Sequence, residues 1–246
     1  MNSLRLIPLV VERDVRILFS DSFLIGIMFA NFAIDLFVTA ATFGRLIPSG
    51  NYFLYIAPGS NFITASVAAF QSGRDVWREK YIKDLTSYLL SLPAPRPVFA
   101  FSRVLGGVVR SLIATFPGTL VISYLYGITF DPRIFAAFMI VGLFSLGIVG
   151  LSITVSSFAS SIEMFVTVRS AVQLYLSFLS TLFYPATVFP PILTPLVASN
   201  PMTWAVEAFR SLPQAHGLLG PVSVLIAPSV AFALLGTVCY LWYAKL

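Results

Sequence analysis

Few residues in this chain could do chemistry, and most catalytic constellations cannot be built from them. The only lysines are Lys80, Lys83 and Lys245, and none follows a glycine-rich turn, so there is no phosphate-binding loop of the GxxxxGK[ST] type. His216 is the only histidine, which excludes the ligand spacing of zinc hydrolases. The only cysteine, Cys239, lies in an apolar run, so we expect no disulfide framework and no cysteine-based metal site. We therefore expect neither a catalytic residue nor a metal site in this chain.

A serine–histidine pair for proteolysis inside the membrane would have to join Ser152 to His216. The distribution of positive charge described below places Ser152 toward the cytoplasm and His216 outside. The two side chains are therefore not expected to meet.

Two polar stripes run along expected membrane spans. One contains Asn31, Asp35, Thr39 and Thr42, and the other contains Arg169, Gln173, Ser177, Ser180 and Tyr184. Asp35 lies near the bilayer midplane, where inserting an aspartate costs about 2.5–3.5 kcal/mol, so it must face protein or water. The stripes either line a solute path or a seam between two copies, or they join helices through hydrogen bonds of about 0.6 kcal/mol each. The candidate residues for a translocation path are Asn31, Asp35, Thr39, Gln173 and Ser177.

Residues 74–97 form the only long charged segment. Its helical stripe consists of Trp77, Tyr81, Leu85, Tyr88 and Leu92, and its acidic and basic residues are nearly balanced. An aromatic and leucine stripe is not expected to stay in water, so something must cover it. The mixed charge favours a protein partner, because a membrane-surface helix is usually polybasic. A solvated helix across the protein's own cytoplasmic face is the alternative.

The composition indicates an all-α membrane protein with one transmembrane domain over residues 1–246. Only 10% of its residues are charged and 58% are hydrophobic, whereas soluble domains carry about 25% charged residues. The apolar stretches are long enough for helices that cross about 30 Å of hydrocarbon. We predict six spans over residues 22–43, 52–71, 104–126, 133–158, 164–184 and 221–243. Small residues in the fourth span, such as Gly147 and Gly150, would let helices approach closely.

An interfacial helix is predicted in residues 1–21, before the first span. Its expected apolar face consists of Leu4, Ile7, Val11, Val15 and Leu18. With this helix in the cytoplasm, all but Arg45, Arg133 and Arg210 of the 15 lysines and arginines lie on the cytoplasmic side. We therefore predict a multi-pass protein of the cell membrane with both termini cytoplasmic.

Arg96, Arg103 and Arg110 recur every seven residues at the cytoplasmic start of the third span. We expect them to reach the lipid headgroups or to hold carboxylates such as Asp84. A role in substrate binding is the weaker interpretation.

Residues 185–220 contain too many prolines for one straight span. We predict a re-entrant hairpin on the outer face, with a short amphipathic helix over residues 203–212. The residues that mark it are Pro185, Asn200, Pro201, Glu207 and Arg210, of which Glu207 and Arg210 form a local i,i+3 pair. An ordinary extracellular loop is the alternative.

Several stretches together resemble one known family. They are YIAPG in residues 55–59, the charged segment RDVWREKYIKDLTSYLLSLPAPR, FYP in residues 183–185, and NPMTWAVEAFR in residues 200–210. Their order is similar to that of the membrane (permease) subunits of type-2 ATP-binding cassette (ABC) exporters, which include drug-resistance and polysaccharide-export permeases. The similarity covers nearly the whole chain, and residues 200–210 are its most specific part. Trp204 departs from it mildly, since many members carry a smaller aromatic residue or histidine there.

The resemblance implies that the loop between the second and third spans is a coupling helix docked on a separate ATPase subunit. The coupling residues would be Trp77, Arg78, Glu79, Tyr81, Asp84, Leu85, Tyr88 and Leu89. ATP and Mg²⁺ would bind to the partner ATPase, with no cofactor in this chain and no nucleic acid partner. Two membrane subunits, identical or related, would pass the solute between them along the first, second and fifth spans.

Two other functions remain open from the sequence. A proton- or ion-coupled secondary transporter would use Asp35, but there is no second acid opposite it and no internal repeat. A membrane scaffold or assembly factor would move no solute. The apolar, aromatic spans fit a lipid-like or amphipathic solute, although any membrane protein contains such residues.

Overall fold

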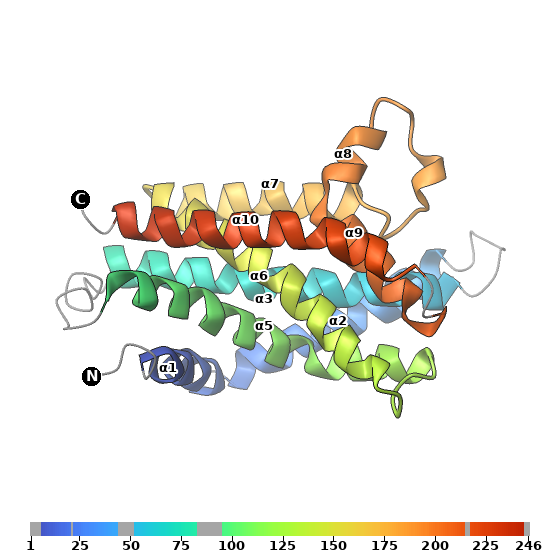
Figure 1. Cartoon of the computed structure of the whole chain (residues 1–246), viewed down its shortest axis with the longest axis horizontal. Helices are drawn as coiled ribbons and strands as arrows, with labels where there is room; N and C mark the ends of the chain where they lie inside the picture. The colour runs from blue at the N-terminus through green and yellow to red at the C-terminus, as the bar shows by residue number, and fades with distance from the viewer. Residues whose placement is uncertain (1–5, 21, 44–51, 83–94, 215–216, 244–246) are drawn as a thin grey trace.

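The computed structural model describes residues 6–20, 22–43, 52–82, 95–214 and 217–243, and every regular element in these ranges is a helix. The helices are α1 (Leu6–Ser20), α2 (Ser22–Phe43), α3 (Tyr52–Tyr81), α5 (Arg96–Leu125), α6 (Arg133–Phe158), α7 (Ile162–Phe178), η2 (Ala186–Val188), α8 (Thr194–Ser199), α9 (Pro201–Ser211), η3 (Leu212–Gln214) and α10 (Leu219–Tyr243). Figure 1 shows the long helices side by side along one axis, with α8 projecting from the bundle. The end that holds α1 is called the α1 end below, and the opposite end is called the α9 end.

Four of the described helices, α3, α5, α6 and α10, are long and apolar enough to cross a membrane. The helices α2 and α6 have the bounds predicted for the first and fourth spans. The second span continues ten residues past its predicted end, to Tyr81, and the third begins at Arg96 rather than at residue 104. The predicted fifth span is too long, because α7 ends at Phe178. The six-span count therefore rests on α2 and α7 as well as on these four helices.

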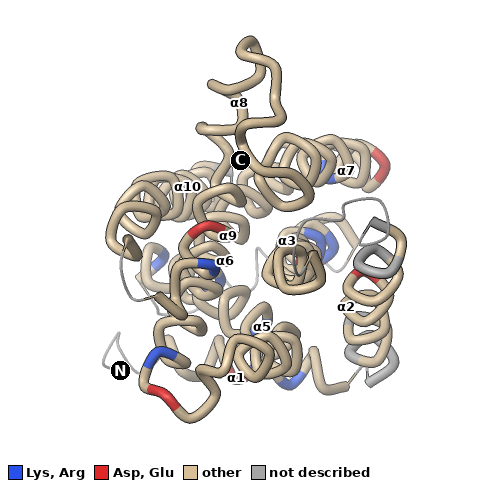
Figure 2. Tube along the Cα trace, turned by 90° about the vertical axis from the view of Figure 1, so that its right-hand side faces the viewer, with Lys and Arg blue, Asp and Glu red and all other residues tan. Residues whose placement is uncertain are grey.

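The central helix is α3, and most of its 30 residues are buried. Figure 2 looks along the bundle and shows α3 surrounded by α2, α5, α6 and α7. Close contact with α6 depends on Gly73, where an added Cβ would collide with the side chain and backbone of Ser152. A glycine also allows α6 to approach α10 closely, since a Cβ on Gly150 would collide with the backbone of Phe232. Small residues thus bring these helices into contact, as predicted for the fourth span.

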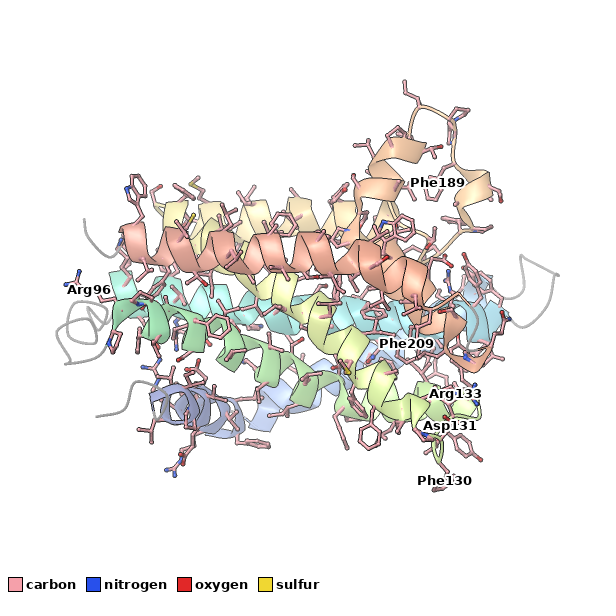
Figure 3. The ribbon with its side chains drawn as sticks, viewed as in Figure 1. Arg96, Phe130, Asp131, Arg133, Phe189 and Phe209 are labelled. Atoms are coloured by element: carbon pink, nitrogen blue, oxygen red, sulfur yellow. The ribbon has the colours of Figure 1, made fainter. Side chains whose placement is uncertain are left out.

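An aromatic cluster fills the core toward the α9 end. The ring of Phe62 on α3 lies 5.2 Å from that of Phe144 on α6 and 6.0 Å from that of Phe209 on α9, both in edge-to-face arrangements. Figure 3 shows Phe209 directed into the bundle. Such pairs favour edge-to-face contact because the ring edge is positive and the ring face is negative. The amphipathic helix predicted for residues 203–212 is therefore α9, whose apolar side belongs to the core.

The first helix, α1, crosses the α1 end and packs against α5 and α2 (Figure 1). Its buried residues are Val10 and Leu18, whereas Val11 and Val15 of the predicted apolar face are half-buried. The predicted face is therefore confirmed at Leu18, whereas its valines are only partly covered. The reason is that α1 turns charged side chains, including Asp14, toward the protein, where they form ion pairs with α3 and α5.

Candidate functional site

A buried cluster of ion pairs joins α1, α3 and α5 at the α1 end of the bundle. Arg103 of α5 donates from Nη1 to Oδ1 of Asp14 at 2.6 Å and from Nη2 to Oε2 of Glu79 at 2.9 Å. Arg13 of α1 donates to the other oxygen of Glu79 at 2.6 Å. The side chain of Arg103 is only 4% exposed, so both of its carboxylate partners are needed to offset the cost of burying it.

A further pair extends the cluster along the same two helices. Arg110 of α5 is paired with Asp75 of α3. Together the cluster contains three arginines and three carboxylates, so its charge is balanced. Gly106 gives α1 room to approach α5, since a Cβ there would collide with the carboxylate of Asp14. The cluster, defined here by Arg13, Asp14, Asp75, Glu79, Arg103 and Arg110, is called the ion-pair cluster below.

The ion-pair cluster joins the end of α3 to the first turns of α5. Glu79 lies in the last turn of α3, and Arg103 lies seven residues after the start of α5 at Arg96. Replacing one partner of a buried ion pair costs about 3–5 kcal/mol because the other charge is left unpaired. The cluster therefore fixes the geometry of α1, α3 and α5 relative to one another at the α1 end.

The residues predicted to couple to an ATPase fall into three groups. Trp77 and Glu79 are buried within this chain: Trp77 donates from Nε1 to the carbonyl oxygen of Ala159 at 3.0 Å, and Glu79 belongs to the ion-pair cluster. Arg78 and Tyr81 are exposed, and Tyr81 is 41% exposed although its ring lies against Trp77. Asp84, Leu85, Tyr88 and Leu89 lie outside the described residues. The stripe that was expected to be covered by a partner is thus covered by this chain at its first member, because residues 74–81 continue α3.

The arginines spaced by seven residues do hold carboxylates, as one interpretation predicted. Arg103 and Arg110 pair with Asp14, Glu79 and Asp75, whereas Arg96 is exposed at the α1 end and points outward from the bundle (Figure 3). Sequence reasoning did not identify these acidic partners. The spacing of the arginines indicated that one face of α5 was charged, but the partners come from two other helices and depend on how those helices pack.

The predicted translocation residues lie on two helices that both pack against α3. Asn31 is exposed and Asp35 is half-buried on α2, while the side chain of Thr39 lies outside the described residues. On α7, Gln173 accepts a hydrogen bond from Ser66 of α3 at 2.8 Å and donates to Ser177 at 3.4 Å. The middle of the α7 stripe therefore joins two helices, and among the described side chains no hydrogen bond connects it to the α2 stripe.

Asn200 holds the end of α7. Its Nδ2 donates to the carbonyl oxygens of Tyr175, Leu176 and Leu179 at 3.0, 3.2 and 2.7 Å. Its Oδ1 accepts from the backbone N–H of Met202 at 2.9 Å and so caps α9. These contacts explain why α7 ends at Phe178, because the amide takes up carbonyl groups that a longer helix would use internally.

Arg210 holds α9 against α3 and the chain that follows α7. Its guanidinium donates to the carbonyl oxygens of Tyr55, Thr181 and Leu182 and lies 3.5 Å from the centroid of the Tyr55 ring. It also donates to Glu207 at 3.2 Å, which confirms the predicted i,i+3 pair. Among the other marked residues, Pro201 is buried at the start of α9 and Pro185 is exposed in the projecting segment. The role of Arg210 in joining three segments could not be inferred from the local pattern.

The helices and their apolar surfaces define an all-helical, multi-pass membrane protein. The family model for ABC-2 type transporters matches residues 5–212. The chain therefore belongs to this family of transporter membrane subunits, and the resemblance noted in the sequence is confirmed. No curated protein matches the chain.

Proposed function

We propose that the chain is the permease subunit of an ATP-driven ABC exporter. Two copies, or two related chains, would form the solute path, and separate ATPase subunits would bind ATP and Mg²⁺. The observation that carries the proposal is the family match over residues 5–212, together with the ion-pair cluster at the base of the charged segment. Export direction and a lipid-like or amphipathic substrate are part of the proposal and follow from the family resemblance.

Coupling would be mechanical. Residues 83–94 would dock on the ATPase, and closure of the ATPase on ATP would displace them. Because the ion-pair cluster joins α3, which precedes this segment, to α5, which follows it, and both to α1, the displacement would be passed on to all three helices together. The central position of α3 would then distribute the movement to α2, α6 and α7.

The orientation in the membrane is also proposed. The α1 end would face the cytoplasm, with α2 and α7 completing six spans and both termini on that side. The segment of residues 185–220 would form a re-entrant hairpin, in which α9 returns into the bundle from the outer face. Its support is the buried apolar side of α9 and the hydrogen bonds of Asn200 and Arg210 that hold it there.

The proposal is tested by purifying the tagged chain from its native membrane and measuring whether an ABC ATPase subunit is retained with it. Tyr81 and Ile82 are 41% and 64% exposed and lie at the end of α3, directly before residues 83–94. The double variant Tyr81→Ala/Ile82→Ala should capture at least fivefold less ATPase than the wild type. Trp77 is unsuitable for this test because it is buried and its loss would disturb the fold.

The matched control is Leu219→Ala, which removes an 84% exposed apolar side chain at the α9 end. This variant should capture as much ATPase as the wild type. The proposed coupling is wrong if the wild-type chain captures no ATPase, or if the Tyr81 and Ile82 double variant captures as much as the control.

The second candidate, a secondary transporter that uses Asp35, is supported by one observation. Asp35 is half-buried and has no ion pair among the described residues. The family match does not favour it. In vesicles with the ATPase, Asp35→Asn should retain ATP-driven transport, whereas a proton-coupled carrier would lose its activity and would need no ATP.

A further inference from the structure

Two half-buried arginines stand apart from the other arginines in the described ranges. Six arginines there pair with carboxylates, namely Arg13, Arg16, Arg103, Arg110, Arg133 and Arg210. Arg78 and Arg96 have no ion pair but are exposed to solvent. Arg74 of α3 and Arg169 of α7 are half-buried, and within the described residues neither has an ion pair or a hydrogen bond. The Nε of Arg74 is fully buried without a partner.

The packing of α3 against α7 brings these two arginines together. The two helices run in opposite directions and are joined by the hydrogen bond between Ser66 and Gln173. From that bond toward the α1 end, Arg74 is eight residues away along α3 and Arg169 is four residues away along α7, which corresponds to about 12 Å and 6 Å. Helical side chains lean toward the N-terminus of their own helix. Arg74 therefore leans back toward the level of Arg169, and Arg169 leans toward the level of Arg74.

The helix geometry therefore places the two guanidinium groups at about the same level on facing helices, where their like charges repel each other. The acids that precede or follow them do not relieve this repulsion. Asp75 is paired with Arg110 and Glu79 with Arg13 and Arg103, while Glu163 on α7 is exposed and has no ion pair within the described residues. Two adjacent, partly desolvated cations cost free energy unless an anion lies between them.

The depth of the pair indicates what the anion is attached to. The 30 residues of α3 span about 45 Å, which equals the thickness of a bilayer with its headgroups. Arg74 and Arg169 each lie seven residues from the helix end on the α1 side, about 10 Å from that end. This is the region where the hydrocarbon gives way to headgroups.

We propose that Arg74 and Arg169 form a binding site for the phosphate group of an anionic amphiphile. Two guanidinium forks match the geometry of a phosphate and are weakly hydrated, so they bind it better than lysines would. The acyl part of the amphiphile would lie in the hydrocarbon that begins at this depth. The site depends on the membrane placement of the α1 end but not on coupling to an ATPase, so either proposal can fail alone.

The test measures lipid binding to the purified chain in neutral detergent. Phosphatidylglycerol, phosphatidylcholine and inorganic phosphate are titrated separately, and bound lipid is counted by native mass spectrometry alongside the Tm. The wild type should retain phosphatidylglycerol and gain Tm from it, with little effect of phosphatidylcholine. Arg74→Gln and Arg169→Gln should each weaken this binding at least fivefold, and the binding should fall as salt is raised. Without lipid, both variants should keep or raise the Tm, because the repulsion is removed.

Arg78→Gln and Arg96→Gln are the matched controls, since both remove an exposed unpaired arginine at the same end. They should bind phosphatidylglycerol within twofold of the wild type. If inorganic phosphate raised the Tm as much as phosphatidylglycerol does, the phosphate site would be supported. Its ligand would then be a soluble phosphate compound rather than a lipid. Unchanged lipid binding in Arg74→Gln and Arg169→Gln would overturn the proposal. The proposal would also be overturned if Arg74→Gln and Arg169→Gln abolished a dimer of the chain without changing the amount of bound lipid. The arginines would then pair with a carboxylate of a second copy.

Discussion

Arg103 and Glu79, 24 residues apart, form a buried ion pair with an Nη2–Oε2 distance of 2.9 Å that connects the start of α5 to the end of α3. The chain between the two helices contains the whole of residues 83–94. The same guanidinium holds Asp14 of α1, so three helices share one positive charge. In the proposed coupling, a displacement of residues 83–94 would therefore act on α1, α3 and α5 together, because these ion pairs join the three helices.

Breaking this brace should destabilise the protein strongly. Glu79→Gln and Arg103→Gln should each lower the free energy of unfolding by up to about 3–5 kcal/mol, because a charge that stays buried loses one of its two ion-pair partners. The double variant should lose less than the sum of the two, which a double-mutant cycle in a denaturant titration measures.

The control is Glu12→Gln, which breaks the exposed i,i+4 pair with Arg16 and should cost no more than about 0.5 kcal/mol. If Glu79→Gln and Arg103→Gln also lowered the free energy of unfolding by no more than about 0.5 kcal/mol, the ion-pair cluster would not hold the three helices together.

The close contact of α3 with α6 gives a second prediction. Gly73→Ala should destabilise the protein, because its Cβ would meet the backbone and side chain of Ser152. Gly142→Ala on α6 should be neutral or stabilising by up to about 1 kcal/mol, since the nearest atom lies 3.8 Å away and alanine favours a helix. Thermal unfolding of the two variants compares them directly, and an equal Tm would contradict the packing.

Asn200 should be sensitive to the smallest change of its side chain. Asn200→Asp keeps the acceptor for Met202 but replaces the donor with a negative charge that faces the three carbonyl oxygens at the end of α7. We expect a loss of about 1–3 kcal/mol or more in unfolding free energy, together with faster proteolysis after α7. Ser199→Ala, at an exposed neighbour, should change stability by less than about 0.5 kcal/mol. Comparable behaviour of the two variants would rule out the capping role.

The connection between α5 and α6 carries a pH-dependent contact. The side chain and backbone N–H of Arg133 both donate to Asp131, and these hydrogen bonds lower the pKa of its carboxyl from 3.8 to about 2. Since the folded-state pKa is lowered, the stabilisation is complete above about pH 4 and is lost as the pH falls through about 2. A carboxyl ¹³C titration should find Asp131 still ionised at pH 3. A pKa near 4 would contradict the contact.

The sequence predicted the helices better than their ends and partners. Apolar length and turn residues were sufficient for α2 and α6, since these helices finish where the polar connections begin. The end of α3 was placed ten residues too early, because Asp75 and Glu79 were assigned to a charged loop that meets a protein partner, although they pair with arginines of this chain's own α5. The end of α7 was placed too late, because its apolar pattern continues past the carbonyl groups that Asn200 takes up. Both errors arise from contacts between segments far apart in the chain, which no local pattern contains.

The central claim is tested most directly by measuring whether ATP moves the end of α3 that lies at the α1 end, in the two copies of the chain. In the complex with its ATPase, spin labels are attached at Ile82→Cys in both copies, with Cys239→Ser to remove the native thiol. A second pair of labels, at Leu219→Cys, reports on the α9 end.

The account predicts that the distance between the Ile82→Cys labels changes by several ångströms when ATP is trapped. When Glu79 and Arg103 are both replaced by methionine, one of two results is expected. Either the Ile82→Cys distance no longer changes with ATP, or it changes without a matching change in the Leu219→Cys distance. A distance at Ile82→Cys that is the same with and without ATP would contradict the central claim that the charged segment transmits the ATPase movement to the helices.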